Sequence, residues 1–467
     1  METRKEHDFL GELDIPAEAY YGVQTMRAVQ NFRISNGSIS QFPSFIRGLA
    51  VVKKAAAFAN TELGVLEPNI CTAICAACDE LLEGKMYDQF PVDTIQGGAG
   101  TSMNMNVNEV IANRALEIMG HKKGEYEFCH PNNHVNCSQS TNDAYPTALR
   151  IALYHELGDL AQHMAYLQQG FAQKSLEFAD IVKMGRTQLQ DAVPMTLGQE
   201  FSAYAATIGE DIQRLEEVRK LVLEINFGAT AIGTGINAPP DYARVVRNHL
   251  RLLSGLDVVT SENLIEATWD TGCYVQISSV LKRTAIKLSK ICNDLRLLSS
   301  GPRTGINEIN LPPLQPGSSI MPGKVNPVIP EVVNQVCFDI IGKDVTISLA
   351  AEAGQLELNV MEPIIAHTLF HGIQRLQRAC VTLQDKCISG ITANRERCYE
   401  LVVNSIGIVT NLVPILGFEK AAVIAQTALA TGRSVADIAL EDRYLTKEQL
   451  DKLLSPESMI HPARAKL

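Results

Sequence analysis

The sequence lacks long apolar runs and is poor in aromatic residues. No uninterrupted apolar stretch of the 467-residue chain reaches the roughly eighteen residues of a membrane-spanning helix. The charged start, Met1–Asp8, is not followed by an apolar segment, so we expect no export signal, no membrane partner and a cytoplasmic protein. Aromatic residues make up only 6% of the chain, with a single Trp. The core must therefore be built from Ala, Leu, Ile and Val, a composition that favours helices.

The chain also lacks an excess of basic residues. Lys and Arg number 41 against 52 Asp and Glu, which gives a formal net charge of −11 and argues against nucleic acid as a partner. The eleven cysteines are an odd number, scattered from Cys71 to Cys398 without an export signal. We expect them to be free thiols of a reducing compartment rather than a disulfide framework.

Proline is absent from the interior of several long segments, and because proline breaks helix interiors, these segments permit long helices. Between residues 146 and 194, apolar residues from Leu149 to Phe171 recur every three or four positions, which is the period of a helix face. The same period runs from Ile277 to Leu295. With the segments after Pro194, Pro330 and Pro363, the pattern predicts about five long helices in a central bundle shared between subunits.

The expected fold class is mainly all-α, with three domains in each subunit. Residues 1–140 are mixed and include helical stretches near 50–63 and 104–118, whereas residues 141–393 form the long-helix bundle. Residues 394–467 form a small helical domain, in which Thr446 and Gln449 have the spacing of a capping box. Seven prolines between residues 302 and 330 predict an irregular segment within the bundle domain.

Two groups of metal-compatible residues have a better explanation than a metal site. Cys71, Cys75 and Cys78 have a spacing that can hold an iron–sulfur cluster, but the spacing is also i, i+4, i+7 in an Ala-rich segment. We interpret them as a buried helix stripe. Two cysteines and two histidines between residues 129 and 137 could bind zinc, but the loop that holds them is rich in Asn, so we do not favour a zinc site.

A Gly-Lys pair between Gly317 and Val325 resembles a phosphate-binding loop only superficially. The two glycines, Gly317 and Gly323, are six positions apart rather than five, and Pro322 interrupts the loop. Val325 also stands where the metal-binding hydroxyl should be. A nucleotide site is therefore not expected.

Four segments are dense in hydroxyls, amides and glycine: residues 97–106, 132–142, 185–191 and 317–326. We call them the polar islands. In a helix bundle their polar groups must be satisfied by one another or by a ligand. The glycine-rich turn at 97–102 precedes a helix start, a position that suits a carboxylate or a phosphate. The islands therefore predict a small polar ligand at an end of the bundle.

Three polar islands resemble the active-site segments of the aspartase/fumarase lyase superfamily. Residues 317–327 read GSSIMPGKVNP, which is the most specific match, and residues 97–102 (GGAGTS) and 138–142 (SQSTN) resemble the other two segments. The resemblance covers essentially the whole chain. Residues 139–143, 185–192 and 328–334 look like the aspartate ammonia-lyase branch rather than the fumarases.

The resemblance implies reversible deamination of L-aspartate to fumarate and ammonia, in a homotetramer whose sites draw segments from three subunits. Removal of the C3 proton leaves a dianionic aci-carboxylate, so the site must offer many donors where that charge develops. Ser318 matches the catalytic base, activated by Lys324 and by loop amides. The donors to the developing charge are expected to be Thr101, Ser140, Thr141 and Ser319. The α-carboxylate is expected to bind Lys324, Thr187, Asn326 and Gln188, and the amino group Asn142.

One position departs from the superfamily's commoner pattern. Fumarases and some aspartases carry His where this chain has Gln188, while Glu331 is retained. In fumarases that His resembles one half of a charged pair that acts near the water that is added or removed. Gln188 cannot titrate, so this pair is lost here and a hydratase is less expected. The alternatives to an ammonia-lyase are a fumarate hydratase and a catalytically silent helical scaffold. No cofactor is expected, and a divalent metal is expected at most as an activator, because the sequence presents no clear ligand set.

Overall fold

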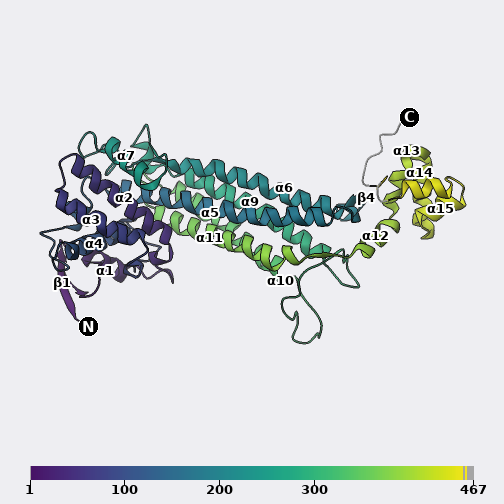
Figure 1. Cartoon of the computed structure of the whole chain (residues 1–467), viewed down its shortest axis with the longest axis horizontal. Helices are drawn as coiled ribbons and strands as arrows, with labels where there is room; N and C mark the ends of the chain where they lie inside the picture. Colours follow the sequence, from purple (N-terminus) through teal and green to yellow (C-terminus); the bar gives the residue numbers. More distant parts are fainter. Residues whose placement is uncertain (1, 456–457, 460–467) are drawn as a thin grey trace. The chain divides into compact units, whose positions relative to one another are not determined.

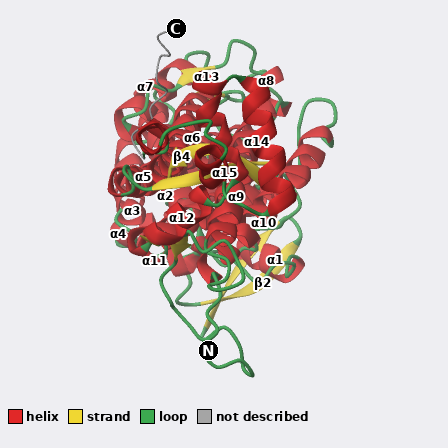
Figure 2. Cartoon of the chain, turned by 90° about the vertical axis from the view of Figure 1, so that its right-hand side faces the viewer, coloured by secondary structure: helices red, strands yellow, loops and turns green. Residues whose placement is uncertain are grey.

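The computed structural model describes residues 2–455 and 458–459, and these residues are mainly α-helical, as predicted (Figures 1 and 2). All five predicted long helices are present. They are α5 (Thr141–Glu177), α6 (Leu197–Arg219), α9 (Gly272–Leu298), α10 (Val328–Glu352) and α11 (Glu362–Lys386).

Helix α5 begins before Pro146 rather than after it, which the proline rule did not anticipate. Pro146 has no N–H, so the carbonyl of Asn142, four residues earlier, loses its helical partner. The side-chain amide of Asn226 donates to that carbonyl at 2.9 Å and replaces the missing bond. A tertiary contact therefore permits proline in the second turn.

The described chain divides into two compact units. Unit 1 takes the described residues within Met1–Gln162, Gln213–Ala285 and Phe338–Gln377, and unit 2 takes those within His163–Ile212, Ile286–Cys337 and Arg378–Leu467. The boundaries fall inside the five long helices, so each helix contributes one part to each unit. The division into three domains at residues 140 and 393 stays a prediction. Residues 456–457 and 460–467 of the predicted C-terminal domain lie outside the described residues.

Buried polar contacts join the long helices within each unit. In unit 1, Asp344 of α10 accepts hydrogen bonds from Ser278 of α9 at 2.7 Å and from Lys282 of α9 at 2.8 Å. In unit 2, the amide of Asn334 on α10 donates to the hydroxyl of Ser289 on α9 at 2.8 Å. Such pairs fix the rotation of one helix against the next, because a shifted helix would leave a buried polar group unsatisfied.

Unit 1 also contains shorter helices and two small sheets. The helices are α1 (Val23–Asn31), η1 (Ile39–Gln41), α2 (Pro43–Glu62), α3 (Pro68–Leu82), η2 (Tyr87–Gln89), α4 (Thr101–Ile118), η3 (Pro131–Val135), η4 (Lys220–Leu223), α7 (Tyr242–Ser254) and α8 (Glu266–Trp269). Strands β1 (Thr3–Asp8) and β2 (Gly11–Pro16) pair antiparallel, with Thr3 opposite Pro16, and β5 (Glu224–Ile225) pairs parallel with β6 (Val259–Thr260). Helix α3 packs between α2 and α4. Cys71, Cys75 and Cys78 are buried on α3, which confirms their interpretation as a core stripe.

Unit 2 contains a β-hairpin that the sequence analysis missed. Strands β3 (Val182–Thr187) and β4 (Gln190–Thr196) pair antiparallel across a two-residue turn formed by Gln188 and Leu189. Both turn residues have positive φ, +55° and +60°, which a hairpin turn of this type normally obtains from Asn-Gly or Asp-Gly. The polar island at 185–191 is therefore a hairpin tip, and the usual sequence signal for it is absent.

The rest of unit 2 is a short sheet and the C-terminal helices. Strand β7 (Ile309–Asn310) pairs with β8 (Thr392–Ala393), and the helices are η5 (Ile388–Gly390), α12 (Arg395–Val403), η6 (Ile406–Leu412), α13 (Val413–Leu416), α14 (Phe418–Thr431), α15 (Val435–Glu441) and α16 (Lys447–Leu453). Val182 and Met184 of the hairpin share an apolar cluster with the C-terminal helices. The predicted capping box of Thr446 and Gln449 is confirmed at the start of α16. Residues 311–327 form no helix or strand element, which confirms the middle of the predicted irregular segment. The prediction was wrong at residues 309–310, which form β7, and at Pro330, which lies in the first turn of α10, where a missing N–H costs no helical hydrogen bond.

A helix that crosses a bilayer must be both long and apolar. Within the described ranges, no single helix is both long and apolar enough to do so. The bent pair Arg395–Val403 and Ile406–Leu416 meets the criteria of length and composition when its two parts are taken together.

Candidate active site

The ten predicted site residues fall into two sets, one in each unit. Unit 1 carries Thr101, Ser140, Thr141 and Asn142, which we call the unit 1 set. Unit 2 carries Thr187, Gln188, Ser318, Ser319, Lys324 and Asn326, which we call the unit 2 set.

The first residue of the unit 1 set, Thr101, stands at the start of α4, where the glycine-rich turn ends. Gly100 has a φ of +91°, and a Cβ atom at this position would lie 2.3 Å from the ring of Tyr145. Both facts require glycine at residue 100. The exposed Thr101 hydroxyl donates to the carbonyl of Gly98 at 2.8 Å.

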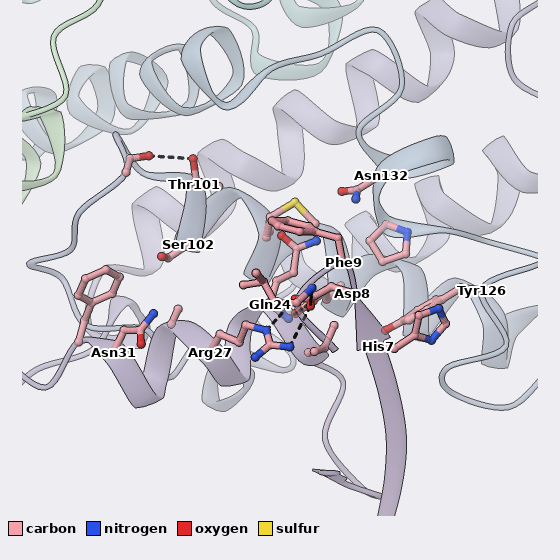
Figure 3. A pocket seen from close by; sticks show the side chains of 18 of the residues that line it. His7, Asp8, Phe9, Gln24, Arg27, Asn31, Thr101, Ser102, Tyr126 and Asn132 are labelled. Carbon is pink, nitrogen blue, oxygen red and sulfur yellow. Dashed lines mark hydrogen bonds and ion pairs between the residues drawn. The ribbon is translucent and has the colours of Figure 1, made fainter. Parts of the chain in front are cut away.

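A cavity of about 890 Å³ in unit 1 adjoins this turn (Figure 3). Its lining includes Thr101 and Ser102 at the start of α4, Asn132 within the π-helical turn η3, and Arg27 of α1. The Arg27 guanidinium pairs with the carboxylate of Asp8 at 2.8 Å, and this bond lowers the pKa of Asp8. Apolar side chains such as Phe9 and Phe32 also line the cavity, so it combines apolar walls with polar groups beside one predicted donor.

The other three residues of the unit 1 set lie at the N-terminus of α5, which a buried aspartate holds in place. Asp143 accepts a hydrogen bond from the backbone N–H of Ser140 at 2.9 Å, and its second oxygen accepts from Gly228 at 3.1 Å and Thr230 at 2.9 Å. Burial raises the pKa of Asp143 to about 7, although these bonds oppose the shift. The Asn142 side chain donates to the carbonyl of Ala231 at 2.7 Å. This part of the site is rigidly built.

A fully buried lysine on α2 joins two polar islands in unit 1. The Lys53 ammonium donates to Asn104 Oδ1 at 2.7 Å, Asn136 Oδ1 at 3.0 Å and Gln139 Oε1 at 2.9 Å. Asn104 in turn donates from Nδ2 to the hydroxyl of Thr141 at 3.1 Å. The segments at 97–106 and 132–142 therefore meet at one buried cation.

Sequence analysis missed Lys53, although it carried a signal. The residue follows Val51 and Val52 and precedes a run of alanines, and residues 49–52 and 55–57 of the same helix are buried. Charged residues are almost never fully buried without a specific polar partner. A lysine at an apolar helix position is therefore a reason to look for acceptors.

In unit 2, the hairpin tip carries Thr187 and Gln188 into solvent, while the strand below it is anchored. Both residues are exposed. Lys183 and Arg186 of β3 pair with the fully buried carboxylate of Glu308, at 3.1 Å and 2.9 Å. Lys183 also pairs with Glu200 of α6. Glu308 thus holds the hairpin against the segment that leads towards residues 317–326.

The remaining unit 2 residues lie in the irregular loop. Its ends are tied where the Gly317 N–H donates to the Lys324 carbonyl at 2.7 Å and the Asn326 side chain donates to the Gly317 carbonyl at 2.8 Å. The Ser318 hydroxyl accepts from the backbone N–H groups of Ile320 at 3.2 Å and Met321 at 3.1 Å. Ser319 and the Lys324 side chain are exposed.

The two histidines between residues 129 and 137 are occupied with backbone contacts. His130 Nδ1 accepts from the N–H groups of Asn132 and Asn133 and caps η3, and His134 Nδ1 accepts from the N–H of His130 at 2.8 Å. In the part of the chain that the structure describes, no group of three or more His, Cys, Asp or Glu side chains is arranged to hold a metal ion.

Two family models match the sequence of this chain. A family model described as Lyase matches residues 11–342, and a model described as Fumarase C C-terminus matches residues 408–461. Together these models span most of the chain and include all ten predicted site residues.

Full-length relatives give closer comparisons. The chain is 61% identical to the aspartate ammonia-lyase of Helicobacter pylori (strain ATCC 700392 / 26695) over 459 residues, which cover 98% of each protein. It is 56% identical to the aspartate ammonia-lyase of Escherichia coli (strain K12) over 461 residues, which cover 98% of this chain and 96% of that one. The crystal structure of a fumarate lyase:delta crystallin from Brucella melitensis bound to cobalt superimposes with a TM-score of 0.96 at 53% identity, covering 99% of this chain and 100% of that chain.

Proposed function

The chain belongs to the lyase family of the aspartase/fumarase superfamily, and we propose on this premise that it is an aspartate ammonia-lyase, which interconverts L-aspartate with fumarate and ammonia. The observation that carries the proposal is the similarity over nearly the full length to relatives named for this activity. Gln188 at the hairpin tip supports an ammonia-lyase over a hydratase, because an amide cannot join a titrating pair.

In the proposed mechanism, the Ser318 oxygen removes the C3 proton of aspartate. A serine needs activation to act as a base, and the two backbone N–H groups that already face its oxygen would stabilise the alkoxide form. Lys324, exposed on the same loop, adds positive charge and binds the α-carboxylate together with Thr187, Gln188 and Asn326. Closure of this loop over the substrate would exclude water.

The charge that develops on the β-carboxylate is assigned to hydroxyl donors. These are Thr101, Ser140 and Thr141 of the unit 1 set, with Ser319 of the unit 2 set. Asn142 contacts the amino group, which leaves as ammonia. Donors already fixed in position stabilise a developing anion without the cost of reorganising solvent.

We further propose a homotetramer in which each site combines segments from three subunits. Its support is the exposed apolar face of α10, where Phe338, Val345 and Leu349 are 60%, 58% and 63% exposed. These residues are seven and four positions apart, so they lie along one side of the helix. A long apolar stripe in water indicates a surface that another chain covers.

Mixing inactive variants tests the shared site. Ser318→Ala alters the unit 2 set and Thr141→Val alters the unit 1 set, so a hybrid tetramer can combine intact segments from different subunits. We expect activity to return when the two variants are unfolded and refolded together, and not when each is refolded alone. Mixed tetramers that stay inactive would show that each subunit builds its own site.

The activity itself is tested by following the ultraviolet absorbance of fumarate with L-aspartate and, separately, with L-malate. Fumarate formation from L-aspartate supports the ammonia-lyase. Turnover of L-malate alone would identify a hydratase. Turnover of neither substrate would favour a helical scaffold without this chemistry.

We propose that the reaction needs no cofactor, because the protonated amine is already a good leaving group. The Brucella relative was crystallised with cobalt, so a divalent ion is best treated as an activator to be tested. Activity that survives dialysis against a chelator supports the proposal. Activity that is lost with the chelator and restored by Mg²⁺ or Co²⁺ would contradict it.

We also propose that the enzyme works in the cytoplasm. The support is chemical: all eleven cysteines are free, and nine of them are buried. Free thiols persist where the compartment is reducing. Fractionation of cells that express the intact gene tests the location directly.

A further inference from the structure

We propose that Lys53 is a positioning residue: through Asn104, it fixes the direction of the hydrogen bond at Thr141, so that the Thr141 hydroxyl donates its proton to a bound carboxylate. The inference rests on the proposed function, because that carboxylate belongs to aspartate or fumarate. It assigns a role to two residues that do not themselves touch the substrate.

The direction of each bond follows from the donors available. A lysine ammonium can only donate, so Asn104 must present its oxygen to Lys53, at 2.7 Å. The Asn104 NH₂ group then faces the Thr141 oxygen at 3.1 Å, and Thr141 accepts this bond. A hydroxyl that accepts still has its own proton to give. Among the described residues, Asn104 is the hydrogen-bond partner of this hydroxyl, which leaves the proton available for a ligand.

The orientation of Asn104 cannot reverse at low cost. A reversed amide would turn its NH₂ group towards the ammonium and leave both groups as donors facing each other. The other two ammonium protons are engaged by Asn136 and Gln139, at 3.0 Å and 2.9 Å. Gln139 uses its own NH₂ group on the carbonyls of Val135 and Cys137, so its orientation is fixed as well. Three acceptors match the three protons of the charged form.

The burial of Lys53 argues for a specific role. The side chain is 0% exposed, and its three hydrogen-bond partners are neutral amides rather than a carboxylate. Burial lowers the pKa of Lys53 to about 7, against the attraction of Asp143 on α5 and Cys78 on α3. A buried charge costs stability unless polar partners compensate it, as these three amide oxygens do. What the charged ammonium supplies is a group that donates in three directions and does not accept.

The sharpest test is Asn104→Asp, which keeps the shape of the side chain and reverses the bond. Both oxygens of the introduced carboxylate accept, so one pairs with Lys53 and the other takes the Thr141 proton. We expect KM for L-aspartate and the inhibition constant of succinate, an unreactive dicarboxylate, to rise about 10- to 100-fold, the effect of losing one hydrogen bond to a charged group. The ion pair between Lys53 and the new carboxylate keeps the fold intact.

The matched control is Asn106→Asp on the same helix. Asn106 is also buried, but its NH₂ group donates to the carbonyl of Gln89 and not to Thr141. This variant introduces a buried carboxylate without changing the bond at Thr141. We expect the folded Asn106→Asp enzyme to keep its KM within about threefold of the parent, within the usual scatter of such effects. An equal rise in KM for both variants would overturn the proposal.

A double-mutant cycle separates positioning from general disruption. In Thr141→Val, the hydroxyl is already gone, so adding Asn104→Asp should change KM little further. Lys53→Met should likewise raise KM in the parent and much less in the Thr141→Val background. Fold-changes that multiply in the double variants would show that Lys53 and Asn104 do not act through Thr141, and would defeat the proposal.

The outcomes also separate this inference from the proposed function. If the parent protein does not deaminate L-aspartate, the proposed function fails. If the parent is active and Asn104→Asp leaves KM and succinate inhibition unchanged, only the role of Lys53 fails.

Discussion

The unit 1 set and the unit 2 set are held in different ways. In unit 1, Thr141 and Asn142 begin a long helix and are bonded to buried groups, with Lys53 and Asp143 beneath them. In unit 2, Thr187 ends strand β3 and Gln188 begins the turn, both at the exposed hairpin tip, and Lys324 lies on a loop without helix or strand. The first arrangement suits fixed donors, and the second suits groups that approach after the substrate has bound. Changes in unit 1 should therefore affect folding and binding together, whereas changes in unit 2 loops should affect substrate binding or chemistry and leave folding unchanged.

The largest effect is expected from Ser318→Ala. Loss of a catalytic base should lower kcat about 10³-fold, while the melting temperature stays unchanged because the loop around Ser318 is exposed. Steady-state kinetics and thermal unfolding measure the two effects. Ile320→Ala is the control, since the Ile320 side chain is 84% exposed on the same loop and has no assigned role, and the substitution keeps the backbone N–H that faces Ser318. A lower melting temperature for Ser318→Ala would remove the contrast between the sets.

The next largest effects are expected from replacing Lys324 of unit 2 and Lys53 of unit 1. Lys324→Met should raise KM about 100-fold, because it removes a charged partner of the α-carboxylate, and it should leave the free energy of unfolding unchanged. Lys53→Met should lower that free energy by about 2 to 3 kcal/mol, because three buried amide oxygens lose their donor. Urea unfolding of both variants measures the difference. Equal stability of the two variants would contradict the proposed rigidity of unit 1.

Glu308→Gln should show that unit 2 also contains a rigid part, below the hairpin tip. Removing one partner from a buried ion pair costs about 3 to 5 kcal/mol, and because Lys183 keeps Glu200 as a second partner, we expect about 2 kcal/mol. Asp180→Asn is the control, because Asp180 pairs with Arg395 in solvent and an exposed pair contributes little to stability. Urea unfolding measures both variants, and equal losses would mean that Glu308 does not anchor the hairpin.

The smallest expected effect is a change of stability with pH, and it arises from buried carboxyl groups of unit 1. Burial raises the pKa of Asp143 to about 7, so between about pH 5 and 7 the native state binds a proton that the unfolded state releases. Raising the pH through this range should therefore lower stability, by up to about 1 kcal/mol per pH unit. Buried Glu109, with a pKa raised to about 7, acts in the same direction.

Asp143→Asn should make this pH dependence shallower, as measured by urea unfolding at a series of pH values. Asp180→Asn should leave it unchanged, because pairing with Arg395 lowers the pKa of Asp180 and moves its titration out of the range. A slope that is the same in Asp143→Asn and in the parent would show that Asp143 stays ionised when buried.

Much of the fold could be predicted because it depends on local rules. Proline-free segments with apolar residues at helix spacing became α5 and α9, and the irregular segment that the crowded prolines predicted is present at residues 311–327. The buried stripe of Cys71, Cys75 and Cys78 followed from the same helix period. The hairpin was missed because Gln188 and Leu189 adopt positive φ without the residues that usually do so. There the pairing of the strands determines the turn.

The ten candidate site residues were predicted from motifs, whereas the groups that hold them in place were not predicted. Lys53, Asn104 and Glu308 lie far in sequence from Thr141 and Thr187, and no spacing rule connects them. Their roles depend on burial, and burial is known only when the chain is packed. A lysine in an apolar helix was the one signal that the sequence offered.

Sequence alone determined the helical class, the positions of the long helices, the polar islands and the family, because each depends on residue type and spacing along the chain. Tertiary structure decided that Pro146 lies inside a helix, that a hairpin carries Thr187, and that Lys53 orients Asn104 towards Thr141. The physical reason is the same in each case. A hydrogen bond or an ion pair between distant segments acquires its strength and its direction only after folding has removed water from around both partners.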